Sequence, residues 1–250
     1  MNTVFITGAT SGFGEAIART LAKQDVKMII TGRTADKLMQ VASEIESSTK
    51  TKVLPLVFDV RDYDACVKAV NSIPEDFRDV DVLVNNAGLA VELNPIQAGA
   101  IEDWERMIDT NIKGLLYITR LVSPWMVARK KGHIINLGST ASHEIYYGGN
   151  VYCATKHAVN ALTKGMRTDM LPYGIKVTQI SPGACETNFS VVRFHGDKEK
   201  AAKVYEGYDP LVAQDIADVV EFVLSRPAHV CLNEVIMTPT AQFNGVIHRD

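Results

Sequence analysis

The chain has 250 residues, of which 46% are hydrophobic and 22% are charged, so it can bury a sizeable core. Its formal net charge of −3 lacks the basic excess that nucleic-acid-binding proteins normally show. Four separated cysteines form no Cys-x-x-Cys pair, and neither a signal peptide nor an apolar run long enough to span a membrane is recognised. We therefore expect a cytoplasmic globular protein.

Short apolar segments alternate with helical periodicity along the whole chain. Apolar, β-branched runs predict strands at residues 3–7, 26–31, 53–58, 80–84, 132–137, 175–180 and 231–237. Hydrophobic spacings of three and four residues predict helices after Gly14 and at residues 35–48, 63–72, 102–130, 151–171 and 215–224. Pro124 lies inside the longest of these helical patterns and predicts a kink or break there.

The predicted strands are apolar on both faces, as in a parallel sheet that helices cover on both sides. The alternation predicts an α/β fold: a single doubly wound Rossmann-type domain, residues 1–250, with a parallel sheet of about seven strands. Within it, the polar stretch at residues 183–210 is predicted to be a loop or a small helical lid. The tail at residues 247–250 is predicted either to fray or to reach a neighbouring subunit's pocket.

Three glycines lie between the first predicted strand and the first predicted helix, in the pattern Gly8-x-x-x-Gly12-x-Gly14. Glycine lets the backbone turn tightly and approach a ligand closely, and the free N–H groups of a helix N-terminus favour a diphosphate. In isolation the trio also fits an ordinary tight turn. Its place after the first strand of a doubly wound sheet favours dinucleotide binding.

With Thr7 before it, this loop resembles that of the short-chain dehydrogenase/reductase family. Further motifs of that family follow in order: Asp59-Val60, Asn85-Asn86-Ala87-Gly88, Asn111, Ser139, Tyr152-x-x-x-Lys156, Pro182-Gly183 and Thr187. The resemblance covers essentially the whole chain. It implies that the dinucleotide is bound by Gly8, Thr10, Ser11, Gly12, Phe13, Gly14, Arg33, Asp59, Val60, Asn86, Ala87, Gly88, Tyr152, Lys156, Pro182, Gly183 and Thr187.

Tyr152 and Lys156 are four residues apart on a predicted helix, so their side chains share one face. A neighbouring ammonium lowers the pKa of a phenol, about 10 when free, so Tyr152 is the predicted proton donor and acceptor. Ser139, at a predicted strand end, can hydrogen-bond the substrate oxygen. The resemblance adds Asn111, which in the family holds a water that links the lysine to solvent. Each residue alone has an ordinary structural explanation, but the joint pattern indicates catalysis.

The end of the second predicted strand carries Arg33, and no acidic residue comes before Asp36. An acidic residue there would bind the ribose 2′-hydroxyl of NAD, whereas arginine accommodates the 2′-phosphate of NADP. We therefore expect NADP(H), with a surface arginine after a turn as the alternative reading of Arg33. No metal is expected, because the six histidines are scattered and none has a partner at the spacing of a zinc motif.

Arg193, flanked by valine and phenylalanine, and Tyr146, between Ser139 and Tyr152, are predicted to bind an anionic substrate group beside those two residues. A solvated arginine on a flexible lid is the alternative. Residues 148–152, 186–189 and 192–194 resemble one branch of the family. That branch contains NADP-dependent 3-hydroxy acid dehydrogenases, which act on serine, allo-threonine and 3-hydroxypropionate, and sulfoacetaldehyde reductases, which make isethionate.

The resemblance implies an NADP(H)-dependent oxidoreductase that interconverts a small anionic aldehyde or 3-oxo acid with its alcohol, with carboxylate or sulfonate left open. The alternative is a non-catalytic dinucleotide-binding redox sensor, although such proteins usually lose a catalytic residue and this chain retains all four. In the family the helix at residues 151–171 and the long helix before it pair across a twofold axis. The pairing and a homotetramer are implied by small or apolar side chains on both helices: Ala154, Ala158, Ala161, Leu162 and Gly165 on the first, and Leu115, Ile118 and Leu121 on the second. No nucleic-acid or membrane partner is expected.

Overall fold

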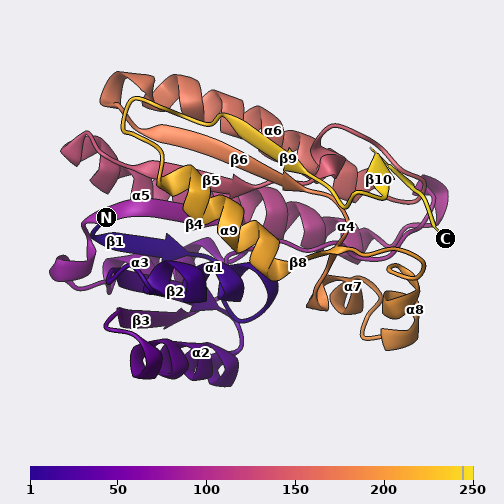
Figure 1. Ribbon diagram of the computed structural model, residues 1–250, viewed down its shortest axis with the longest axis horizontal. Coiled ribbons are helices and arrows are strands. Elements are labelled where there is room, and N and C mark those ends of the chain that lie inside the picture. The colour runs from indigo at the N-terminus through magenta and orange to yellow at the C-terminus, as the bar shows by residue number, and fades with distance from the viewer. Residues whose placement is uncertain (244, 250) are drawn as a thin grey trace.

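A parallel sheet of seven strands runs through the centre of the protein, in a computed structural model that describes residues 1–243 and 245–249 (Figure 1). The strands lie in the order β3-β2-β1-β4-β5-β6-β9, and every neighbouring pair is parallel. Their bounds are β1 (Thr3–Ile6), β2 (Lys27–Gly32), β3 (Lys52–Val57), β4 (Val80–Asn85), β5 (His133–Leu137), β6 (Lys176–Pro182) and β9 (Glu234–Met237). The order reverses between β1 and β4, where ligands bind in doubly wound sheets.

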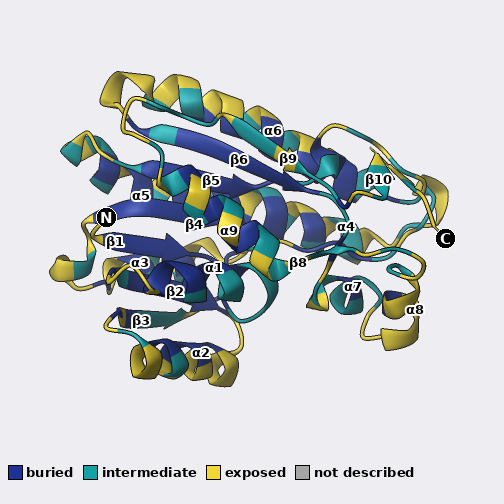
Figure 2. Cartoon of the chain, in the orientation of Figure 1, coloured by how far each residue is buried: buried dark blue, intermediate teal, exposed yellow. Residues whose placement is uncertain are grey.

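Helices cover both faces of this sheet. One face packs against α1 (Gly12–Ala22), α2 (Ala35–Ser48) and α9 (Ala213–Leu224), and the other against α3 (Tyr63–Asn71), α5 (Leu115–Arg129) and α6 (Asn150–Met170). Figure 2 shows buried strands between helices whose outer sides are exposed. The predicted doubly wound α/β fold with a seven-stranded parallel sheet is therefore confirmed.

Alternate side chains of each central strand enter different cores. In β1, Val4 and Ile6 belong to the core that α1 and α2 complete, whereas Phe5 belongs to the core on the opposite face. Successive side chains of a strand point to opposite faces, so a strand that is covered on both sides must be apolar throughout. This double covering explains why β1 has no polar face, whereas β5 and β6 also bury polar side chains, Asn136 and Gln179 among them.

The long helix predicted for residues 102–130 is interrupted, but not at Pro124. Regular α4 (Ile101–Ile108) passes into a π-helical turn at Asp109–Gly114 and then into α5, which continues through Pro124. The proline removes the donor for the carbonyl of Arg120, but Arg120 is exposed, so water can replace that donor. The break predicted at Pro124 lies instead at the π-helical turn, a feature that is frequent at functional sites.

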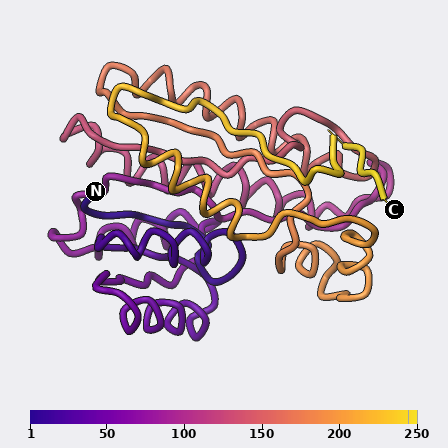
Figure 3. The backbone as a smooth tube through the Cα atoms, in the orientation of Figure 1, coloured from indigo at the N-terminus to yellow at the C-terminus, as the bar shows by residue number. Residues whose placement is uncertain are grey.

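Short elements lie beyond the carboxyl ends of the strands (Figures 1 and 3). Residues 183–210, predicted to be a loop or helical lid, contain β7 (Cys185–Glu186), α7 (Asn188–Arg193) and α8 (Lys198–Lys203), and β7 pairs with β8 (Leu211–Val212). A hairpin of β10 (Gln242–Phe243) and β11 (Val246–Ile247) brings the C-terminal residues to the same end of the sheet. Among the described residues, no helix has the length and apolar character to cross a membrane.

Candidate active site

A cleft of about 650 Å³ opens at the carboxyl edge of the sheet, beside the segment that carries α7 and α8. Most of the residues that the sequence singles out line this cleft. They are Gly8, Thr10, Ser11, Gly12, Phe13, Arg33, Asp59, Val60, Asn86, Ala87, Gly88, Ser139, Tyr146, Tyr152, Lys156, Pro182, Gly183, Thr187 and Arg193. Gly14 and Asn111 lie behind the lining rather than on it.

The glycine loop adopts a backbone that other residues rarely reach. Gly8 and Gly12 have φ of 68° and 58°, in the left-handed region. Gly14 has another role, because a Cβ there would come within 2.3 Å of the carbonyl oxygen of Gly8. Its missing side chain lets α1 approach the loop closely. The first residues of α1, Gly12 and Phe13, line the cleft, so free N–H groups of the helix N-terminus are available to a ligand there.

The end of β4 braces this loop. The side-chain amide of Asn86 donates to the carbonyl oxygens of Thr7 (2.8 Å) and Gly8 (3.0 Å). In return, the hydroxyl of Thr7 accepts from the backbone N–H groups of Asn86 (3.0 Å) and Ala87 (2.9 Å). The result is a rigid cradle without projecting side chains at the positive end of a helix dipole, and the diphosphate of a dinucleotide fits it.

Charged side chains follow β2 and β3 at one end of the cleft. Arg33 comes directly after β2, its side chain is half exposed, and its Nη1 lies 3.7 Å from Oδ2 of Asp59. Burial acts to raise the pKa of Asp59, but hydrogen bonds from Arg61 and the charge of Arg33 hold that pKa below its ordinary value. Asp59 is therefore ionised at neutral pH. A 2′-phosphate fits beside Arg33, which supplies a permanently charged planar fork.

Tyr152, Lys156 and Ser139 come together in the cleft. Helix α6 carries the tyrosine and the lysine one turn apart, and both are buried. The hydroxyl of Ser139 accepts from the backbone N–H of Ala141 (3.1 Å) and so caps a short 3₁₀ turn after β5. Nζ of Lys156 donates to the carbonyl oxygen of Leu137 (2.8 Å) and lies 5.9 Å from the centre of the Tyr152 ring.

The pKa of Tyr152 responds to Arg193 and Ser139 rather than to Lys156. Burial raises this pKa, while the charge of Arg193 and a hydrogen bond with Ser139 lower it. The sequence predicts that Lys156 lowers it. In the structure, however, Nζ of Lys156 is bonded to the carbonyl of Leu137, and burial lowers the pKa of the lysine itself to about 8. At neutral pH Tyr152 is therefore a phenol that can donate a proton.

Asn111 holds the π-helical turn against two other segments. Its Oδ1 accepts from the backbone N–H of Leu89 (2.9 Å), and its Nδ2 donates to the carbonyl of Leu89 (2.8 Å) and to the hydroxyl of Thr155 (3.0 Å). Thr155 lies between Tyr152 and Lys156 on α6, so these bonds tie α6 to the segment after β4. The water-holding role that the family resemblance implies for Asn111 stays a prediction.

Helix α7 begins at the glycine loop. The hydroxyl of Thr187 caps its first turn by accepting from the backbone N–H of Phe189 (3.2 Å). The side chain of Thr187 also lies 3.7 Å from the position that a Cβ would occupy at Gly12. One end of this short helix is thereby set against the loop that fits a diphosphate.

The other end of α7 places Arg193 beside the predicted catalytic tyrosine. Nη2 of Arg193 donates to the hydroxyl of Tyr146 (2.9 Å), and Cζ lies 5.3 Å from the ring centre of Tyr152. Cζ also lies 5.2 Å from the ring of Phe189, a cleft residue that sequence reasoning missed. The carbonyl of Arg193 accepts from the backbone N–H of Glu92 (2.9 Å). Nε of Arg193 is buried and has no hydrogen-bond partner within the described part of the chain.

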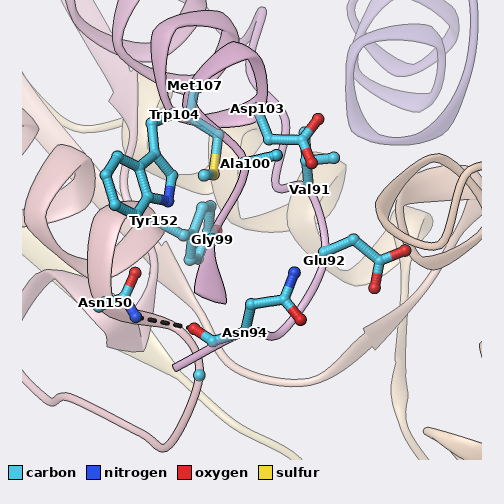
Figure 4. Close-up of a pocket in the computed structure, with 11 residues that line it drawn as sticks. Val91, Glu92, Asn94, Gly99, Ala100, Asp103, Trp104, Met107, Asn150 and Tyr152 are labelled. Carbon is cyan, nitrogen blue, oxygen red and sulfur yellow. Dashed lines mark hydrogen bonds between the residues drawn. The ribbon is translucent and has the colours of Figure 1, made fainter. Parts of the chain in front are cut away.

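A much smaller cavity, of about 10 Å³, adjoins Tyr152 (Figure 4). Trp104 and Met107 of α4 line it together with the tyrosine. The side-chain amide of Asn150 donates to the carbonyl of Asn94 (2.8 Å) at its edge, which ties the start of α6 to the segment after β4. A space of this size holds at most one water molecule. We therefore interpret it as part of the packing behind the catalytic ring.

The sequence left open where the C-terminal tail, residues 247–250, lies. Ile247 and Arg249 line the cleft of their own chain, and Arg249 donates to the carbonyl oxygens of Val204 (3.2 Å) and Glu206. The predicted fraying is therefore wrong for residues 247–249, because these contacts hold the tail on the lid; Asp250 lies outside the described residues. The Asn-Gly pair at residues 244–245 of the sequence is the hairpin signal that could have indicated this arrangement.

The chain is similar to known dehydrogenases over nearly its whole length. Residues 2–197 match the family model described as short chain dehydrogenase. The chain is 48% identical over 249 residues to the NADP-dependent 3-hydroxy acid dehydrogenase YdfG of Salmonella typhi, which covers 98% of this chain and 99% of that protein. It is 43% identical over 240 residues to the serine 3-dehydrogenase of Agrobacterium fabrum, with coverages of 96% and 94%. The solved closed form of serine dehydrogenase complexed with NADP+ matches with a TM-score of 0.92 and 44% identity, covering 99% of this chain and 100% of that chain.

Proposed function

The chain belongs to the short-chain dehydrogenase family, and from this premise we propose that it interconverts a small anionic aldehyde or 3-oxo acid with its alcohol. It is an NADP-dependent oxidoreductase that acts on a CH–OH group, of the 3-hydroxy acid and serine dehydrogenase type. The observation that carries the substrate class is Arg193, which lines the cleft with its guanidinium beside Tyr152.

Arg193 is suited to hold the acid group of such a substrate. Arg193 lines the cleft, and a permanently charged guanidinium there suits a ligand oxyanion. The bond to Tyr146 fixes the orientation of the guanidinium in advance. Cζ lies 5.3 Å from the ring centre of Tyr152, so one small molecule can place its acid group on Arg193 and its carbonyl oxygen at the hydroxyl of Tyr152. Carboxylate and sulfonate both meet this requirement.

Tyr152 is the acid and base that we propose for the reaction. In the reducing direction its hydroxyl donates a proton to the substrate carbonyl oxygen, and in the oxidising direction it takes the proton back. Ser139 holds that oxygen by a hydrogen bond, and the buried Lys156 keeps an ionisable amine close to the phenol. NADP(H), when bound, supplies or accepts the hydride.

A substrate panel tests this function. Malonic semialdehyde, sulfoacetaldehyde, serine and allo-threonine would be compared by kcat/KM with NADP(H), followed at the nicotinamide absorbance. We expect turnover of the anionic substrates, and the ratio between malonic semialdehyde and sulfoacetaldehyde decides between carboxylate and sulfonate. Turnover of none of them by a protein that still binds NADPH would favour the non-catalytic redox sensor instead.

Replacing Arg33 by alanine tests the assignment of this residue to the 2′-phosphate. We expect the apparent KM for NADPH to rise about tenfold, the lower range for a contact with a charged group, because the side chain is half exposed. The KM for NADH should change little, since NADH lacks the phosphate. Steady-state kinetics measures the KM values for NADPH and NADH. Equal increases in both KM values would refute the assignment of Arg33 to the 2′-phosphate.

We propose a homotetramer that uses the outer side of α6. Ala154, Ala161 and Gly165 are exposed there. Apart from its chain neighbours and the backbone of its own helix, no atom of the described residues lies within 4 Å of the Cβ position at Gly165, so a second helix can approach closely. Leu115 and Ile118 of α5 are buried in the core and contribute nothing to this surface. Sedimentation should give about four times the chain mass of 27.4 kDa, and Ala161→Arg should lower it. A wild-type species at the mass of one chain would contradict the proposal.

A further inference from the structure

The carboxylate of Asp59 lies between two arginines at one end of the cleft. Arg61 binds it in the forked geometry, with Nη2 at 2.7 Å and Nε at 3.0 Å from Oδ2 and Nε at 3.1 Å from Oδ1. The backbone N–H of Arg61 also donates to Oδ1 (3.0 Å). Arg33 is more distant, at 3.7 Å from Oδ2. Asp59 is thus paired first with Arg61 and only marginally with Arg33.

This arrangement bears on a difficulty in binding a phosphate at Arg33. Gly32 pairs with Val57 in the register of β2 and β3, so Arg33 and Asp59 leave the sheet close together. A phosphate held by Arg33 therefore lies in the field of the Asp59 carboxylate, which repels it. The same carboxylate also competes with the phosphate for the guanidinium of Arg33.

We propose that Arg61 sets the preference for NADP(H) over NAD(H) by occupying Asp59, which leaves Arg33 available to the 2′-phosphate. The proposal rests on the assignment of Arg33 to that phosphate. Arg61 acts here as a positioning residue, because it does not line the cleft and reaches the coenzyme site through Asp59. Hydrogen bonds from Arg61 and the charge of Arg33 together hold the pKa of Asp59 below its ordinary value against burial, so the competing charge is present at neutral pH.

When Arg61 is removed, Arg33 should form a closer ion pair with Asp59. The Arg61→Ala variant leaves one carboxylate and one guanidinium that are already 3.7 Å apart, and their closer pairing withdraws Arg33 from the phosphate. A direct contact between Arg61 and the phosphate would also weaken NADPH binding, but independently of Asp59. The double variant that also carries Asp59→Asn separates these two mechanisms.

Direct binding measurements provide the test. Calorimetric Kd values for NADPH and NADH would be determined for the wild type, Arg61→Ala, Asp59→Asn, the double variant and Arg33→Ala, with thermal unfolding as a check on folding. We expect Arg61→Ala to raise the ratio of the NADPH Kd to the NADH Kd by about three- to fivefold, the scale of an exposed ion pair. High salt should diminish this change. Asp59→Asn in the Arg61→Ala background should restore the ratio.

The outcomes that overturn the proposal are distinct. An unchanged ratio in Arg61→Ala, while Arg33→Ala shifts it, would overturn the role of Arg61 alone. A shifted ratio that Asp59→Asn does not restore would show that Arg61 acts on the coenzyme without Asp59, which also overturns it. An unchanged ratio in Arg33→Ala would overturn the phosphate assignment itself and this proposal with it.

Discussion

Replacing Tyr152 by phenylalanine is expected to lower kcat by about 10²- to 10⁴-fold, the usual contribution of general acid–base catalysis. The change removes the hydroxyl that donates and accepts the proton. It keeps the ring, which packs edge-on against Phe189 at 5.9 Å between centres and lies beside Arg193. The Kd for NADPH should therefore change little. Turnover of an anionic aldehyde, followed at the nicotinamide absorbance, measures the effect.

Tyr146→Phe is a matched control for this variant. It removes the same hydroxyl from a neighbouring tyrosine, whose partner is Arg193. Its main expected effect is a higher KM for anionic substrates, because Tyr146 orients the group that holds the acid. Turnover that survives intact in Tyr152→Phe would refute the assignment of Tyr152 as the acid and base.

Arg193→Ala should reduce kcat/KM for anionic substrates by about 10- to 150-fold, the loss of one charge-assisted contact. The guanidinium lines the cleft and lies 5.3 Å from the ring centre of Tyr152. Part of the loss should appear in kcat, because a poorly held acid group also misplaces the carbonyl relative to the phenol. A comparison of kcat and KM over the substrate panel measures both parts.

A neutral aldehyde of similar size is the internal control for Arg193→Ala. Its kcat/KM should change little, since it carries no acid group, and the Kd for NADPH should stay near the wild-type value. If neutral and anionic substrates lost activity equally, Arg193 would be a structural residue of the lid. The proposed anionic substrate would then lose its main support.

The central strands were predictable because helices cover them on both faces. Their apolar runs stand out from the amphipathic helices between them, and the helix predicted at residues 35–48 coincides with α2 (Ala35–Ser48). The last strand shows the limit of such reasoning. It was predicted from residue 231, but its pairing with β6 begins at Glu234 opposite Gln179. Composition does not reveal the register between segments so far apart in the chain.

The π-helical turn was beyond local reasoning for a similar reason. Pro124 is a strong local signal for a break in the helix. It removes only the hydrogen-bond donor for the carbonyl of Arg120, and because Arg120 is exposed, water can replace that donor. The actual irregularity surrounds Asn111, whose side chain binds Leu89 and Thr155 on two other segments. Only the folded arrangement supplies those partners.

The candidate site was predictable where short motifs follow strands, because parallel strand ends meet at one edge of a sheet. The sequence also placed Arg193 beside Tyr152, but as a substrate-binding residue and not as the group that lowers the pKa of the tyrosine. Lys156 is its neighbour in the sequence motif, whereas the charge that lowers its pKa comes from Arg193 on a later segment. Arg249 lines the cleft only because the hairpin of β10 and β11 turns the chain back toward it, which local sequence does not reveal.

The length of helix α7 fixes the distance between the glycine loop and the residue proposed to bind the substrate's acid group. Thr187 sets its start against the glycine loop, and Arg193, its last residue, reaches Tyr152. One residue more or fewer between them would turn Arg193 by about 100° around the helix axis and carry its guanidinium away from the tyrosine. Substitutions along α7 can be absorbed by repacking, whereas an insertion or deletion would disconnect the acid-binding group from the coenzyme loop. The number of residues in α7 therefore sets how the acid-binding group lies relative to the glycine loop.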